Sequence, residues 1–85
     1  MNKKLYILIV EDSEDDALLI IRQFKKADYD IISKRVETAY QMHTSLADAS
    51  WELVISDYNL PEFDAPSALT VLKKSGLDVP FIVVS

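Results

Sequence analysis

Two hydrophobic periodicities alternate along this chain of 85 residues, and their order restricts the fold more than any other feature. Residues 5–10 form an unbroken apolar run, which is typical of a strand buried on both faces. A helical pattern follows, beginning after Ser13 and ending near residue 27, and one of its faces is apolar. That face holds Ala17, Ile20, Ile21 and Phe24.

The same alternation continues along the rest of the chain. The predicted elements are, in order, a polar edge strand over residues 31–37, a helix over 39–49 capped by Thr38, a central strand over 53–56 that ends at Asp57, a helix from Pro66 to about Gly76, and a strand over 80–84. The second helix is predicted to turn Met42, Leu46 and Ala49 toward the core.

The order β-α-β-α-β-α-β with short connections predicts the α/β class, with an open parallel sheet and right-handed crossovers. No internal repeat, low-complexity tract or linker divides the chain, so we expect one domain over residues 1–85. Open parallel sheets carry their sites at the carboxyl ends of the strands.

Composition excludes several functions. An apolar fraction of 49% and a charged fraction of 27% are ordinary for a globular domain. The net charge of -5 disfavours binding of nucleic acid, and the absence of cysteine removes thiol catalysis and thiolate metal sites. The longest apolar runs fall far short of the ~20 residues of a membrane span. We therefore expect a cytoplasmic chain that neither enters a membrane nor binds nucleic acid.

Acidic residues follow two of the predicted strands. Glu11 and Asp12 come directly after the first strand, Asp57 ends the third, and Ser85 follows the fourth. In a parallel sheet these ends lie along one edge, where three carboxylates repel one another and favour a hard divalent cation such as Mg²⁺. Such a site indicates phosphoryl transfer, with Asp57 as the nucleophile and the Ser85 hydroxyl as a donor to a phosphoryl oxygen.

Ordinary structural roles compete with this interpretation. Strand-end acids often cap the next helix, and Asp12 and Ser13 lie where a cap belongs. The three acids of the first helical turn are better explained by the helix dipole than by a metal: Glu14, Asp15 and Asp16. Asp57 alone would fit a turn as well as catalysis, and its combination with Glu11 and Asp12 favours the site.

Three blocks of the sequence resemble the receiver domain of two-component response regulators. They are YILIVEDSEDDA at residues 6–17, LVISDYNLP at 53–61 and PFIVVS at 80–85, and they occur in the family's order. The resemblance spans the whole chain, and it implies the flavodoxin-like receiver fold and a part in phosphorelay signal transduction.

The resemblance also implies roles for individual residues. It matches Asp57 to the phosphoacceptor, Asp12 to a direct Mg²⁺ ligand, Glu11 to the acid that holds metal-bound water, Asn59 to the residue whose backbone carbonyl coordinates the ion, Ser85 to the switch hydroxyl, and Pro61 to the proline of the following loop. The implied partner is a histidine kinase or phosphotransfer protein. The implied activity is that of a self-phosphorylating and self-dephosphorylating switch, not of a metabolic enzyme.

Two features depart from the family pattern. Asp64 and Ala65 stand where the family has a glycine, which predicts a different loop shape. The family also continues with a fourth helix, a fifth strand that carries a lysine, and a fifth helix, so we expect a receiver truncated at the C-terminus. Lys73 and Lys74 lie on the third helix and cannot replace that lysine. The strand edge at residues 81–84 is then predicted to be exposed and to promote self-association.

Two other functions were weighed against the phosphoacceptor. A pseudo-receiver would act only in protein interaction or dimerisation; the missing lysine favours it, and the intact acids Glu11, Asp12 and Asp57 disfavour it. An aspartate-nucleophile phosphatase would need a second aspartate two residues after Asp57, where this chain has Asn59.

Overall fold

The computed structural model describes residues 3–58 and 63–84. The predictions for Asn59, Pro61 and Ser85 lie outside these residues. Strands and helices alternate along the chain as β1 (Lys3–Val10), α1 (Glu14–Lys25), β2 (Tyr29–Val36), α2 (Ala39–Asp48), β3 (Leu53–Asp57), α3 (Ala65–Ser75) and β4 (Phe81–Val84). The predicted order of elements is confirmed, and the boundaries differ by a few residues.

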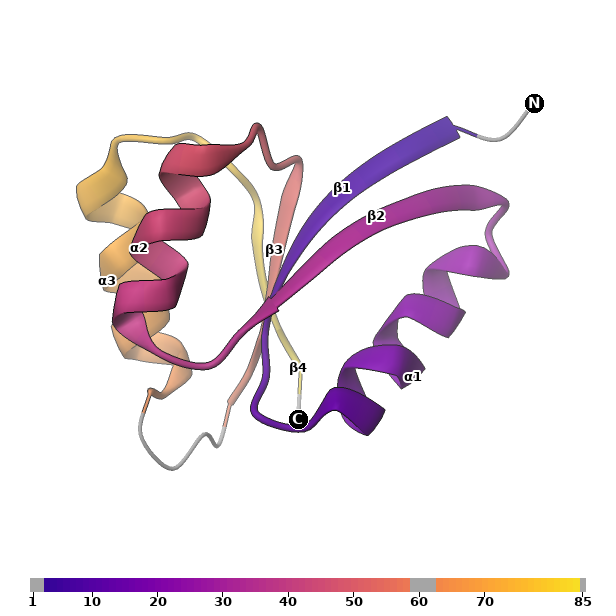
Figure 1. The fold of residues 1–85 in the computed structure, drawn as a ribbon, viewed down its shortest axis with the longest axis horizontal. Helices are drawn as coiled ribbons and strands as arrows, with labels where there is room; N and C mark the ends of the chain where they lie inside the picture. Colours follow the sequence, from indigo (N-terminus) through magenta and orange to yellow (C-terminus); the bar gives the residue numbers. More distant parts are fainter. Residues whose placement is uncertain (1–2, 59–62, 85) are drawn as a thin grey trace.

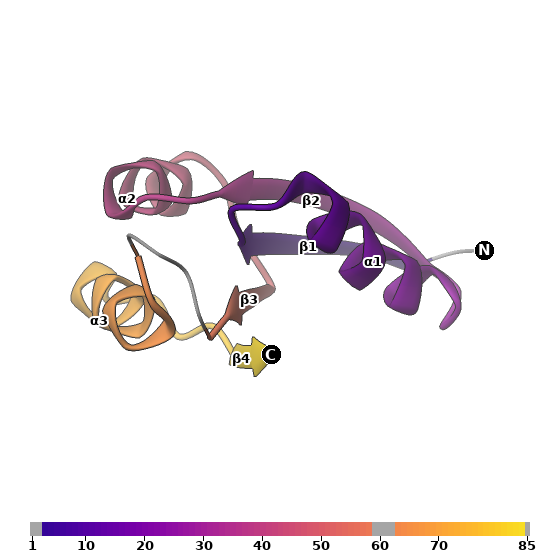
Figure 2. The same cartoon turned by 90° about the horizontal axis from the view of Figure 1, so that it is seen from below.

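The four strands form one parallel sheet in the order β2-β1-β3-β4. Helix α1 covers one face of this sheet, and α2 and α3 lie together on the other (Figures 1 and 2). This arrangement is the open, three-layered α/β fold that the alternating periodicities predict. The polar strand β2 lies at an edge, as its composition indicated.

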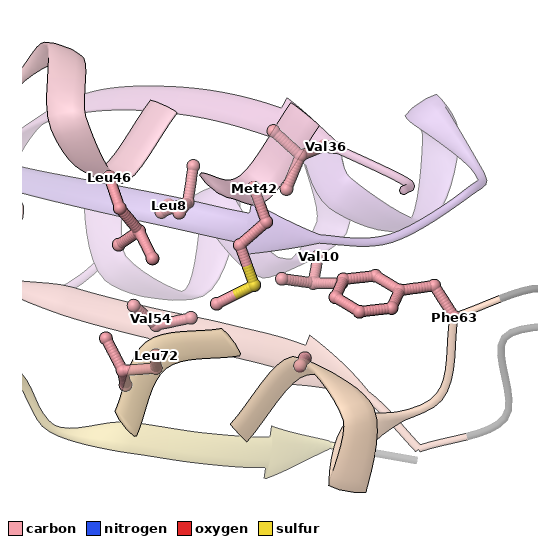
Figure 3. Packing of buried hydrophobic residues seen from close by; sticks show 9 residues of the cluster. Leu8, Val10, Val36, Met42, Leu46, Val54, Phe63 and Leu72 are labelled. Atoms are coloured by element: carbon pink, nitrogen blue, oxygen red, sulfur yellow. The ribbon is translucent and has the colours of Figure 1, made fainter. Parts of the chain in front are cut away.

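Each face of the sheet has its own core because successive side chains of a strand point to opposite faces. In β1, Ile7 and Ile9 pack toward α1, whereas Leu8 and Val10 pack toward α2 and α3. The Met42 side chain points from α2 toward Val10 (Figure 3). Residues 7–10 of β1 and 53–56 of β3 are therefore buried on both sides, which explains why these segments are almost entirely apolar.

Local sequence sets the ends of the helices. Ser13, Thr38 and Asp64 are N-caps, and each side chain accepts a hydrogen bond from a backbone N–H of the first turn. Gly76 ends α3 in a left-handed conformation with φ 78°, which glycine adopts without strain. All three helices thus begin or end on the residue that the sequence suggested.

One prediction from the sequence is wrong. Ala49 is exposed and not part of the core, because α2 ends at Asp48 and Ala49 has extended backbone geometry. Ala65 is buried at the start of α3, where Asp64 caps the helix; the loop before it, whose shape the sequence predicts to differ from the family's, lies largely outside the described residues.

Strand β4 forms the second edge of the sheet in the part of the chain that the structure describes. Its apolar residues Ile82 and Val83 are each 45% exposed. Among the described residues, no helix has the length and hydropathy that crossing a membrane requires.

Self-association of the 85-residue chain through residues 81–84 stays a prediction. We expect sedimentation velocity to show a concentration-dependent rise in mass, because an unpaired apolar strand edge pairs readily with another chain. Val83→Lys should suppress this rise, whereas Lys34→Gln, on the other edge strand, should not. A wild-type chain that stays monomeric at all concentrations would contradict the prediction.

Candidate metal and phosphoacceptor site

The carboxyl ends of β1 and β3 place acidic residues side by side. The two strands pair in parallel, with Val10 opposite Ser56 at the end of the register. The next residue of each chain segment is an acid, Glu11 after β1 and Asp57 at the end of β3. These strand ends meet beside the first turn of α1 (Figure 1).

Three carboxylates converge at this edge. One oxygen from each of Glu11, Asp12 and Asp57 lies within 4.8 Å of the others. Glu11 is buried with 2% of its surface exposed, Asp57 is half-buried and Asp12 is exposed. An all-oxygen, partly solvated ligand set of this size fits a hard divalent cation that keeps several waters, as Mg²⁺ does.

The protein environment raises the pKa of Glu11 from 4.5 to about 7. Burial of the carboxyl is the main cause, because removal from water disfavours the charged form. A hydrogen bond from the backbone N–H of Ser13 to Glu11 Oε1, at 3.1 Å, acts in the opposite direction. Hydrogen bonding with Asp12 and Asp57 and the negative charge of Asp57 raise the pKa further. A bound cation would relieve this crowding of acids.

A cavity of about 290 Å³ opens at the acidic edge. Glu11 and Asp57 line it together with Asp16 and Ile20 of α1 and Val84 of β4. The space is large enough for a phosphoryl-sized group beside Asp57. The acidic edge is therefore an accessible pocket and not a closed set of capping interactions.

The turn between β1 and α1 is held from several sides. The Glu11 N–H donates to the Val36 carbonyl oxygen at 3.0 Å, which continues the pairing of β1 with β2. The Ser13 hydroxyl accepts from the Asp16 N–H at 3.3 Å and caps α1. Arg35 Nη1 donates to the carbonyl oxygens of Glu11 at 3.1 Å and Asp12 at 3.4 Å.

The structure brings together Glu11, Asp12 and Asp57, three of the residues that the sequence placed in the site. Asn59 and Ser85 lie outside the described residues, so their predicted roles stay predictions. Asp12 does not cap α1, because Ser13 does, and its carboxylate is free to join the cluster.

Sequence reasoning missed two residues. The sequence explains Asp16 by the helix dipole, but its place in the first turn of α1 also makes it line the cavity. For the strand that contains Arg35, the sequence predicts only a position at the edge of the sheet. The sequence shows only an arginine near the end of an edge strand. This observation does not identify the carbonyl oxygens of the acidic turn as its hydrogen-bond acceptors.

The open parallel sheet with helices on both faces matches the receiver class of flavodoxin-like α/β folds. A solved structure supports this class: the response regulator MaeR bound to beryllium trifluoride is similar to this chain at a TM-score of 0.78 and 27% identity. The match covers 94% of this chain and 66% of that chain, so this chain spans just under two thirds of its length. No family model matches the sequence, and no curated protein matches it.

The raised pKa of Glu11 predicts how stability depends on pH. Between pH 4.5 and about 7 the folded chain keeps a proton that the unfolded chain releases, so the free energy of unfolding falls as pH rises through this window. One pKa unit corresponds to about 1.4 kcal/mol, so we expect a fall of up to about 3.5 kcal/mol from this group. Urea unfolding without divalent cations should show it.

Glu11→Gln is the matched variant for this measurement. Glutamine keeps the acceptor for the Ser13 N–H but cannot ionise, so stability should change less with pH than in the wild type. Equal pH profiles for the two proteins would show that Glu11 has an ordinary pKa in the fold.

Proposed function

We propose that this chain is a phosphoacceptor signalling domain, which receives a phosphoryl group on Asp57 from a histidine kinase or phosphotransfer protein, with Mg²⁺ as cofactor. The convergence of Glu11, Asp12 and Asp57 within 4.8 Å at an open pocket supports this function most directly. The similarity to a response regulator that binds beryllium trifluoride, a mimic of the phosphoryl group, adds support.

Asp57 has the properties of a carboxylate nucleophile. It is half-buried at the end of β3 and lines the pocket, so a phosphoryl donor can approach it. In the proposed transfer, a carboxylate oxygen of Asp57 forms a bond to phosphorus as the bond from phosphorus to the donor imidazole nitrogen breaks. The product is an aspartyl phosphate, and the imidazole leaves with the bonding electron pair.

Glu11 and Asp12 would hold the cation beside Asp57. Bound Mg²⁺ would neutralise charge on the transferring group. Glu11 lies deepest, and its fixed contact with the Ser13 N–H orients the carboxyl. Asp12 is exposed, which suits a direct ligand that faces solvent and donor. Because the domain modifies itself and turns over no separate metabolite, we propose that it is a switch and not a metabolic enzyme.

Intact-mass measurement tests the proposal. Incubation with acetyl phosphate and Mg²⁺ should add the mass of one phosphoryl group to the wild type, and Asp57→Asn should lose the adduct completely. Removal of the cation with EDTA should also abolish it, because the donor would then meet three uncompensated carboxylates.

Asp15→Asn is the control for this experiment. Asp15 is an exposed acid in the first turn of α1. It belongs neither to the carboxylate cluster at Asp57 nor to the lining of the cavity. We expect this variant to keep the adduct. An adduct of wild-type size in Asp57→Asn would place phosphorylation elsewhere and overturn the assignment of Asp57.

Thermal unfolding separates the phosphoacceptor from a pseudo-receiver. At Mg²⁺ tenfold above its Kd, binding adds about 1.4 kcal/mol to the free energy of unfolding. For a domain of this size, each kcal/mol raises Tm by roughly 4–8 °C. We expect such a rise in the wild type and little or none in Asp12→Asn. A wild type whose Tm does not respond to Mg²⁺ would favour a function in protein interaction alone.

A further inference from the structure

We infer that Arg35 is a positioning residue for the acidic site, holding the turn between β1 and α1 in the conformation that directs Glu11 and Asp12 toward Asp57. This inference rests on the proposed cation site and extends it to strand β2, which supplies none of the three clustered carboxylates. Arg35 would act through the backbone of the turn and not as a ligand of the cation or the phosphoryl group.

The contacts of one nitrogen atom carry the inference. Arg35 Nη1 lies 3.1 Å from the carbonyl oxygen of Glu11 and 3.4 Å from that of Asp12. These carbonyls belong to the two consecutive residues whose carboxylates lie within 4.8 Å of Asp57. A donor that fixes both peptide groups restricts the backbone rotations that would move the two carboxylates apart.

The backbone of Arg35 is itself fixed. In the parallel pairing of β1 with β2, Ile9 lies opposite Arg35 and Val10 opposite Val36. The Glu11 N–H then donates to the Val36 carbonyl oxygen at 3.0 Å. Arg35 therefore projects from the last paired rungs of the two strands, where its side chain spans the turn that follows β1.

Glu37 completes the support. Its Oε2 lies 3.4 Å from the same nitrogen of Arg35, and the Arg35 side chain is 34% exposed. The guanidinium thus contacts two carbonyl oxygens and one carboxylate through Nη1 and stays partly solvated, so its charge needs no further partner.

The sign of the expected effect distinguishes positioning from simple electrostatics. A positive charge near a cation site repels the cation, so neutralising Arg35 would strengthen cation binding if charge alone mattered. If Arg35 positions the ligands, its loss weakens binding, because Glu11 and Asp12 no longer stay close to Asp57.

Lys34 offers a matched control. It carries the same charge one residue earlier on β2, and side chains of adjacent strand residues point to opposite faces of the sheet. Within residues 3–58 and 63–84, the Lys34 side chain forms no hydrogen bond or ion pair. Lys34→Gln therefore changes the net charge of β2 without removing a contact to the turn.

The test titrates the chain with Mn²⁺ and follows free Mn²⁺ by electron paramagnetic resonance at fixed ionic strength. We expect Arg35→Gln to weaken Mn²⁺ binding by about tenfold, as is common for residues that orient metal ligands. Lys34→Gln should leave affinity unchanged or slightly raise it. Arg35→Lys should lie between Arg35→Gln and the wild type, because an ammonium group restores a donor at a shorter reach. Arg35→Gln that binds as tightly as Lys34→Gln overturns the inference.

Folding and metal binding are checked separately. Thermal unfolding without metal establishes that each variant is folded; if Arg35→Gln is not, Arg35→Met, which keeps the apolar stem, takes its place with the same expected loss. If the wild type binds no Mn²⁺, the proposed cation site fails, and amide hydrogen exchange decides on Arg35. The Ser13 and Glu11 amides should then exchange severalfold faster in Arg35→Gln than in Lys34→Gln, and equal rates overturn the inference.

Discussion

The parallel pairing of β1 with β3 decides where the acidic cluster of this chain lies. Both strands are buried on both faces and run in the same direction, so their carboxyl ends meet at one edge of the sheet. The register ends with Val10 opposite Ser56, and an acid follows each. A shift of this register by one residue would exchange the side chains that face α1 with those that face α2 and α3, so the packing of the two cores also fixes the positions of Glu11 and Asp57.

The acidic edge is unfavourable for the isolated fold. Glu11 is buried beside two other carboxyls, and its raised pKa shows that the protein holds this group where ionisation is difficult. Such a site persists because the cores on the two faces of the sheet supply stability elsewhere. Crowded, partly buried carboxyls are characteristic of functional sites. Binding of a ligand that neutralises their charge stabilises such a fold.

The sequence predicts the site residues that follow strand ends. It does not predict the contact that depends on how far the Arg35 side chain extends. Glu11, Asp12 and Asp57 could be found because long apolar runs end at them, and the resemblance to receiver domains assigned their roles. Arg35 lies in a polar strand, and its contact with the turn depends on the pairing register and on a side-chain conformation that a single sequence does not encode locally. Ala49 was placed in the core because periodicity does not mark the last turn of a helix.

The position of β2 explains how the positively charged side chain of Arg35 can support the proposed cation site. A fully buried strand could not have placed a guanidinium here without a large desolvation cost, whereas an edge strand leaves the Arg35 side chain partly in water. Solvent would weaken the repulsion between Arg35 and a bound cation. The two hydrogen bonds that restrict the backbone of the turn are affected far less by solvent. The polar edge strand thus limits the sheet and also provides a position from which Arg35 can hold the acidic turn.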